Sequence, residues 1–277
     1  EITDPAEPQL PEAHVDSSLH ITYINHATFL VQTANSNILT DPIFSERASP
    51  FQWAGPKRMR PPGIKLDQVP EVDMVFISHN HYDHLDEASV KSIYERDKPL
   101  FIVPLGVGKF LNSIGITNHV ELDWWEDHQW KNLNIQSVPA QHFSGRGMFD
   151  RDKTLWAGYM LETPGHRIYF AGDTGYREAM FRELGERAGN PDVALLPLGA
   201  YRPRWFMSPI HVSPAEALKI HFDVKAGQSI AMHYGTFPLA DEGQFTPVKE
   251  LDSVLVQQGL NDSEFIVLPE GQRYIKN

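Results

Sequence analysis

The chain has 277 residues, a formal net charge of -12 at pH 7 and no cysteine. The lack of cysteine excludes disulfides, thiolate metal ligands and a cysteine nucleophile, and the acidic charge argues against a broad nucleic-acid surface. No apolar run is long enough to cross a bilayer, so we expect a soluble or peripheral membrane protein. The first residue is Glu1 rather than Met, and we therefore expect that an N-terminal signal or anchor has been removed.

Residues 1–18 are rich in proline and acidic residues, which predicts an extended arm ahead of one domain over residues 19–277. The apolar and β-branched run from His20 to Thr33, a turn, and a strand ending at Asp41 predict a hairpin. A second hairpin is predicted further on, and it ends at Asp173. Because the segments FLVQTANSNIL and YMLETPGHRIY align without a gap, we expect two related halves.

The remaining elements alternate between apolar strands and amphipathic helices. Strands are expected at 73–78, 99–104, 192–198 and 228–235, and helices at 86–96, 106–114, 176–187 and 213–222. The last helix has Ser213 as its cap, Pro214 at its first position and Glu216 three residues after the cap. Two sheets with helices outside them fit this order, which predicts an α/β (α+β) fold.

The most informative pattern is the run HNHYDH, which follows the apolar strand 73–77. Its imidazoles and carboxylate face more than one direction as the chain bends into a helix, enough for two neighbouring metals. Three further residues also end strand-like runs, and such ends collect chemistry in open sheets. The alternative is a polar loop with scattered core histidines. The candidates are His79, His81, Asp83, His84, His142, Asp173 and His233.

HNHYDH resembles the H-x-H-x-D-H signature of the metallo-β-lactamase fold, a four-layer αββα sandwich. From about Ile21 to the C-terminus, the sequence resembles the N-acylphosphatidylethanolamine-hydrolysing phospholipases D. The segments that carry this resemblance are GPKRMRPP, VELDWWE, KTLWAG, FAGDTGY, PLGAYRPRWFM, HVSPAEALKIH and MHYGTF. That resemblance implies hydrolysis of N-acylphosphatidylethanolamine, or a related glycerophospholipid, to an N-acylethanolamine and phosphatidic acid. A metal-bound hydroxide would be the nucleophile.

The resemblance also implies how the metals are held. One ion would lie on His79, His81 and His142. The other would lie on Asp83, His84 and His233, and Asp173 would bridge the two. Nitrogen and oxygen donors suit two zinc ions, and the same ligand types accommodate manganese or iron.

Other residues are assigned supporting roles. Asp41 mirrors Asp173 and is expected to hydrogen-bond a metal-bound imidazole, the alternative being that it caps its own turn. His26 is expected in the same area unless it is a core histidine. His211 is a candidate proton donor to the leaving group or a helix-entry histidine. Tyr82 lies between two candidate ligands and is expected to contact substrate.

Two loops mix basic and apolar side chains. The stretch GPKRMR and residues 144–153 suit a phospholipid headgroup or a membrane surface, and the glycines around Arg146 favour a mobile lid that contacts substrate. The tryptophans, including Trp53 and Trp205, are expected in the core rather than at the surface.

Rival functions share the same ligands. A lactonase or other carbonyl hydrolase would use the same metals, and an oxidoreductase would hold iron at the same site. A non-catalytic binding module would use the metals for stability and would leave no open coordination position on them. A nuclease fits the acidic charge poorly. The sequence carries no signal for an oligomeric state.

Overall fold

The computed structural model describes residues 7–277, so residues 1–6 of the predicted arm lie outside the described part. Two seven-stranded mixed sheets dominate it. The first has the order β14-β1-β2-β3-β4-β5-β6 and the second β13-β12-β11-β10-β9-β8-β7. The strands of the first sheet are β1 (Leu19–Asn25), β2 (Thr28–Thr33), β3 (Ser36–Thr40), β4 (Met74–Phe76), β5 (Leu100–Pro104), β6 (His119–Leu122) and β14 (Arg273–Lys276). Those of the second are β7 (Asp127–Trp130), β8 (Leu133–Val138), β9 (Gly158–Glu162), β10 (Arg167–Phe170), β11 (Val193–Pro197), β12 (Gln228–Met232) and β13 (Phe265–Ile266).

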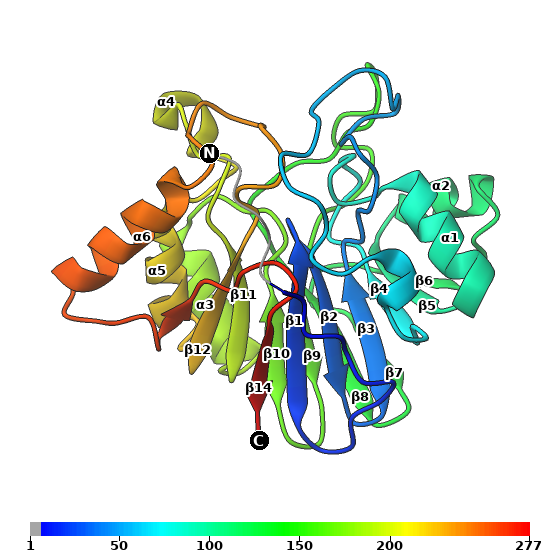
Figure 1. Ribbon diagram of the computed structural model, residues 1–277, viewed down its shortest axis with the longest axis horizontal. Helices are drawn as coiled ribbons and strands as arrows, with labels where there is room; N and C mark the ends of the chain where they lie inside the picture. The colour runs from blue at the N-terminus through cyan, green and yellow to red at the C-terminus, as the bar shows by residue number, and fades with distance from the viewer. Residues whose placement is uncertain (1–6) are drawn as a thin grey trace.

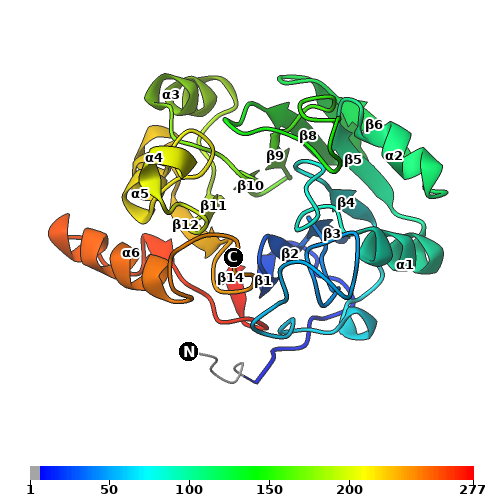
Figure 2. The same ribbon diagram turned by 90° about the horizontal axis from the view of Figure 1, so that it is seen from above.

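Helices cover the outer face of each sheet (Figures 1 and 2). On one side lie α1 (Glu87–Asp97) and α2 (Val107–Ser113), and on the other lie α3 (Glu178–Arg187), α5 (Pro214–Asp223) and α6 (Thr246–Gln257). The short helices are η1 (Leu66–Gln68) and α4 (Arg204–Met207). The predicted four-layer αββα sandwich is therefore confirmed.

Two apolar cores hold the layers together. The larger one joins the facing sheets and extends to the helices outside the second sheet, and it includes the fully buried Phe29, Tyr159 and Tyr169. The smaller one lies under α1 and α2, where Val90 and Ile93 pack on the first sheet. Strands covered on both faces are buried along nearly their whole length, so their side chains do not alternate between apolar and polar.

The predicted helices lie where the patterns put them, within one or two residues. Asp86 caps α1 by accepting from Ser89 N, and Ser213 forms the expected capping box with Glu216 at the start of α5. Helix α6, which carries no capping side chain, was not predicted.

Two expectations were wrong. The run from His20 to Thr33 is not one strand but β1 and β2, because the chain reverses at His26 and Ala27 and His26 takes a left-handed φ of 49°. The expectation that the tryptophans lie in the core was wrong for the two that it named, although Trp124, Trp125 and Trp130 are half-buried against the larger core. Trp53 is 79% and Trp205 82% accessible to solvent.

Parallel strands determine where the loops gather. In the first sheet β3, β4 and β5 run parallel, as do β10, β11, β12 and β13 in the second. Their carboxyl ends therefore meet at one end of the sandwich, the upper end in Figure 1. No helix of the described residues is both long and apolar enough to span a bilayer.

Candidate metal centre

One group of ligands consists of three histidines at the upper end of the sandwich. His79 and His81 belong to the loop after β4, and His142 follows β8. Nε2 of His79 lies 2.8 Å from Nδ1 of His81, and Nε2 of His142 lies 3.3 Å from the same atom. Three imidazole nitrogens thus point at a common spot, as ligands of one cation do.

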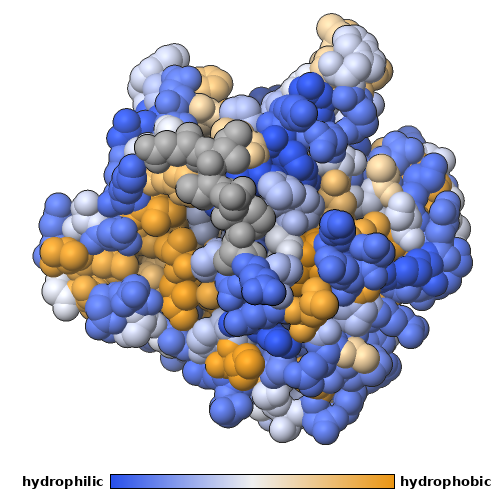
Figure 3. Space-filling model, in the orientation of Figure 1, coloured by the Kyte–Doolittle hydropathy of each residue, from blue (hydrophilic) through white to orange (hydrophobic). Residues whose placement is uncertain are grey.

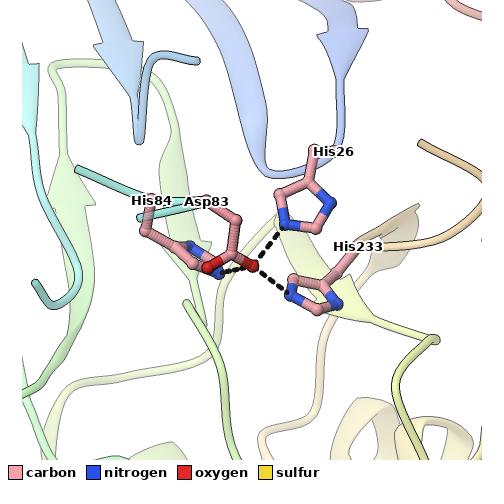
Figure 4. Close-up of side chains that lie close together, drawn as sticks. All are labelled: His26, Asp83, His84 and His233. Carbon is pink, nitrogen blue, oxygen red and sulfur yellow. Dashed lines mark hydrogen bonds and ion pairs between the residues drawn. The ribbon is translucent and has the colours of Figure 1, made fainter. Parts of the chain in front are cut away.

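A second group, drawn in Figure 4, lies beside the first, with the ring centres of His79 and His84 4.2 Å apart. Oδ2 of Asp83 lies 3.3 Å from Nε2 of His84 and 3.4 Å from Nε2 of His233. Since His233 follows β12 and the other two follow β4, the group joins the two halves of the chain. These donors lie close enough together to hold one ion.

Asp173, at the end of β10, lies between the groups. Its Oδ2 is 3.2 Å from Nε2 of His84, 3.1 Å from Nε2 of His233 and 3.7 Å from Nε2 of His142. Among the described residues, the buried atoms here that lack a hydrogen-bond partner include Asp173 Oδ1, His84 Nε2 and His233 Nε2. Buried polar atoms without partners are costly unless an ion or water satisfies them, so the residues present fit two cations.

The outward-facing nitrogens of the ligand rings are held by other groups. Asp41 Oδ2 lies 2.7 Å from Nδ1 of His84. Ser78 Oγ lies 2.9 Å from Nδ1 of His79 and donates to Asp41 at 2.5 Å, and the carbonyl of Ile210 lies 2.9 Å from Nδ1 of His142. Such contacts fix the ring orientation. Asp41 was expected here from its match to Asp173, whereas sequence reasoning missed Ser78 and the Ile210 carbonyl.

The backbone at this end is strained. His26, Asp41, Ala200 and His233 all take a left-handed φ, between 34° and 62°, although none is glycine. Such conformations cost free energy and persist only where the surrounding structure holds them, and they often cluster at functional sites. Gly199 permits a close approach, because a Cβ there would lie 2.1 Å from the carbonyl oxygen of His233.

Burial sets the ionisation of the ring nitrogens. It lowers the pKa of His79 and of His142 well below the ordinary value, so both rings are neutral and able to bind a cation. Burial alone would raise the pKa of Asp173, but the neighbouring His233 and His84 outweigh it and hold that pKa well below its usual range.

His26 lies in the turn between β1 and β2 and contacts the second group (Figure 4). Its Nε2 is 2.9 Å from Oδ2 of Asp83, and its carbonyl accepts from the backbone N–H of His233 at 2.8 Å. Burial, with a contribution from His233, lowers the pKa of His26 to about 3. The neutral ring can therefore donate to the Asp83 carboxylate.

A cleft of about 500 Å³ opens onto both groups. His211 lines it, with Nδ1 3.8 Å from Oδ2 of Asp173 and without a hydrogen-bond partner among the described residues. Burial lowers the pKa of His211 to about 4, so this ring is neutral near pH 7. The remaining wall is largely apolar and includes Phe206, Met207 and Leu239.

Tyr82 and Arg146 contact each other rather than the cleft. The guanidinium lies 4.1 Å from the ring centre of Tyr82 and 4.5 Å from that of Phe110, and it donates to the carbonyls of Asn80 and Leu85 at 2.9 and 2.6 Å. Tyr82 donates to the carbonyl of Arg146 at 2.8 Å. Both side chains line a neighbouring cavity, so their contact with substrate stays a prediction.

The stretch GPKRMR does not present its arginines to a headgroup. Arg58 donates to the carbonyls of Ser45 and Ile43 at 2.8 and 3.2 Å, and burial lowers its pKa to about 10. Arg60 forms a buried pair with Glu270 at 2.6 Å. Both arginines are therefore part of the fold, and the expectation that they face a lipid was wrong.

A family model described as a β-lactamase superfamily domain matches residues 36–234. The chain belongs to the metallo-β-lactamase superfamily. It is 39% identical over 271 residues to N-acyl-phosphatidylethanolamine-hydrolyzing phospholipase D 1 of Caenorhabditis elegans, covering 94% of this chain and 76% of that protein. It is 40% identical over 231 residues to the mitochondrial N-acyl-phosphatidylethanolamine-hydrolyzing phospholipase D of Saccharomyces cerevisiae, covering 81% of this chain and 49% of that protein.

One solved structure has the same fold as this chain. It is a metallo hydrolase from the archaeon Ignicoccus hospitalis, 22% identical with a TM-score of 0.72, covering 94% of this chain and 99% of that chain. Family membership and the relatives together support a metal-dependent hydrolase, and the grouped His and Asp side chains are able to bind metal.

Proposed function

We propose that this chain is a dinuclear metal-dependent phosphodiesterase of the phospholipase D type. Its substrate is N-acylphosphatidylethanolamine or a related glycerophospholipid, and its products are an N-acylethanolamine and phosphatidic acid. The observation that carries the proposal is the position of Asp173, whose Oδ2 faces both ligand groups. The similarity to the nematode and yeast phospholipases D supports the choice of substrate.

In this proposal, His79, His81 and His142 hold one cation, Asp83, His84 and His233 hold the other, and Asp173 bridges them. Zinc is the preferred ion for these donors, and manganese or iron fit the same ligand types. Two divalent cations held by these residues would supply a nucleophile from water near neutral pH and positive charge for the phosphoryl oxygens.

The chain's own residues orient the substrate and the ligands. His211 lines the cleft beside Asp173, and in this proposal its neutral ring hydrogen-bonds the departing ethanolamine oxygen. Asp41, Ser78 and the Ile210 carbonyl hold three ligand rings in their orientations. The apolar wall formed by Phe206 and Met207 excludes water from the bound phosphodiester.

Exposed apolar side chains support contact with a membrane. Phe51 and Trp53 lie on one loop, Met148 and Phe149 on another, and Trp205 on α4, and all five are more than half exposed. These segments project on either side of the upper end in Figure 1, and Figure 3 shows apolar residues where they project furthest. We call these five side chains the apolar tips. Insertion of these tips would place the cleft at the headgroup level of a bilayer.

The test is turnover of a phospholipid panel by metal-stripped protein that is then reloaded with zinc, manganese or iron. We expect two ions per chain and release of N-acylethanolamine from vesicles containing N-acylphosphatidylethanolamine. Release of a free fatty acid, with the phosphodiester left intact, would establish a carbonyl hydrolase instead.

A further inference from the structure

The cleft over the ligand groups has one arginine in its wall. Among the residues that the structure describes, Arg151 is the one Lys or Arg that lines it, together with His81, Asp83 and Asp173. An anionic substrate group in this cleft has to lie close to two carboxylates, and Arg151 at the edge offers it a permanent positive charge and planar donors.

Arg151 is positioned by an aromatic ring. Its guanidinium lies 4.3 Å from the ring centre of Phe143, and Phe143 in turn lies 4.5 Å from the ring centre of His81. An arginine stacked on a ring has its planar donors held in one orientation, so binding an anion costs little further ordering.

The hydrogen-bonding capacity of Arg151 is largely unused. Within the described residues, its one polar contact is a long pair between Nε and Oδ2 of Asp152, at 3.6 Å. Both side chains are at least half exposed, so this pair contributes little. The two terminal amino groups therefore remain available for an incoming ligand.

The other basic residues near this end are engaged elsewhere. Arg146 donates to two backbone carbonyls, Arg58 does the same, and Lys57 pairs with Glu46 at 3.4 Å. None of these three lines the cleft. Of the basic residues in the two loops, Arg151 is thus the one placed to touch a bound substrate.

We propose that Arg151 is the anion-recognition residue of the cleft. It donates hydrogen bonds to the non-bridging oxygens of a phosphodiester and thereby selects anionic phosphodiesters over neutral esters. This inference rests on the proposed function, because it assigns the substrate charge that the same site accepts. An arginine fork suits two phosphate oxygens, whereas a neutral ester offers no negative charge for it to bind.

The experiment compares Arg151→Gln and Arg151→Lys in the metal-loaded protein. The substrates are bis(p-nitrophenyl) phosphate and the neutral p-nitrophenyl acetate, and dimethyl phosphate binding is measured by calorimetry. For Arg151→Gln we expect kcat/KM on the phosphodiester, and the affinity for dimethyl phosphate, to fall about tenfold, with the neutral ester within about twofold. Arg151→Lys should restore part of the loss, and metal content should not change.

Lys153→Gln is the matched control, since Lys153 is an exposed cation of the same loop that does not line the cleft. Equal losses on both substrates, or unchanged dimethyl phosphate affinity in Arg151→Gln, would overturn the inference. If the wild-type protein cleaves no phosphodiester at all, the proposed function fails. The calorimetric comparison then still decides whether Arg151 binds the anion.

Discussion

Asp41 and His84 come from different strand ends, yet their side chains meet in the interior with Oδ2 2.7 Å from Nδ1. Neither side chain is accessible to solvent. Asp41 also accepts from the backbone N–H and the hydroxyl of Ser78. One carboxylate therefore fixes the orientation of His84 and, through Ser78, that of His79, so it acts on both ligand groups.

Asp41→Asn should weaken metal binding without removing a ligand. The amide keeps the size of the carboxylate but loses its charge and part of its accepting capacity, and loss of such a supporting contact typically costs about 10- to 100-fold in metal affinity. The measurement is a competition titration against a chelator of known affinity. His166→Ala, in the hairpin turn between β9 and β10, serves as the control and should leave the affinity unchanged.

Metal binding should release protons. In the metal-free protein, burial lowers the pKa of His233, but Asp173 outweighs it and raises that pKa to about 9. Asp173 and Asp83 likewise raise the pKa of His84 well above its usual range. Both rings then carry a proton at pH 7 that a cation must displace, so metal affinity should fall as the pH is lowered.

Titration calorimetry in buffers of different ionisation enthalpy measures this release. We expect a positive number of protons released per chain at pH 7, decreasing as the pH rises past the raised pKa of His233. A heat of binding that does not depend on the buffer would contradict the assignment of these two rings as ligands.

Removing the Arg146 side chain should lower stability more than it lowers catalysis. Arg146→Met deletes the hydrogen bonds to Asn80 and Leu85, which tie residues 143–153 to the ligand loop. Hydrogen bonds from charged groups contribute about 1.5–3 kcal/mol each, so we expect the loss of both to lower the free energy of unfolding by about 3 kcal/mol or more. Urea denaturation measures it, and Lys57→Met, at an exposed position, should change it by less than about 0.5 kcal/mol. Loss of turnover at full stability would instead assign Arg146 to the substrate.

Local patterns in the sequence were sufficient to predict most of the helices and the loop that carries the metal ligands. HNHYDH carries its chemistry within six consecutive residues, and α5 begins at a capping box that can be read without a structure. The repeat also led to Asp41, which ends the first hairpin as Asp173 ends the second.

Contacts between distant segments could not be read in the same way. The direction of the Arg146 guanidinium depends on Phe110 and on two carbonyls of another loop, and the buried pair of Arg60 depends on Glu270 near the C-terminus. The turn at His26 was missed because no glycine or proline marks it. The left-handed backbone there is held by tertiary contacts, including the bond from His26 N–H to Thr236.

Removing the apolar tips should detach the protein from lipid without affecting its chemistry. The variant combines Trp53→Ser, Phe149→Ser and Trp205→Ser, three side chains that are at least 79% exposed and whose loss should not disturb the core. Because apolar burial drives interfacial binding, we expect affinity for vesicles to fall by about tenfold or more. Vesicle sedimentation measures this, and turnover of a small soluble phosphodiester should stay within about twofold. Undiminished vesicle binding would place the membrane contact elsewhere.

The position of bond cleavage tests the account most directly. Metal-loaded protein is given N-acylphosphatidylethanolamine in water enriched in oxygen-18, and both products are analysed by mass spectrometry. If solvent attacks phosphorus at the site around Asp173, the label appears in phosphatidic acid and not in the N-acylethanolamine. Label in the N-acylethanolamine would show attack at carbon, and label in a released fatty acid would show carbonyl hydrolysis. Either result would contradict the proposed phospholipase D reaction.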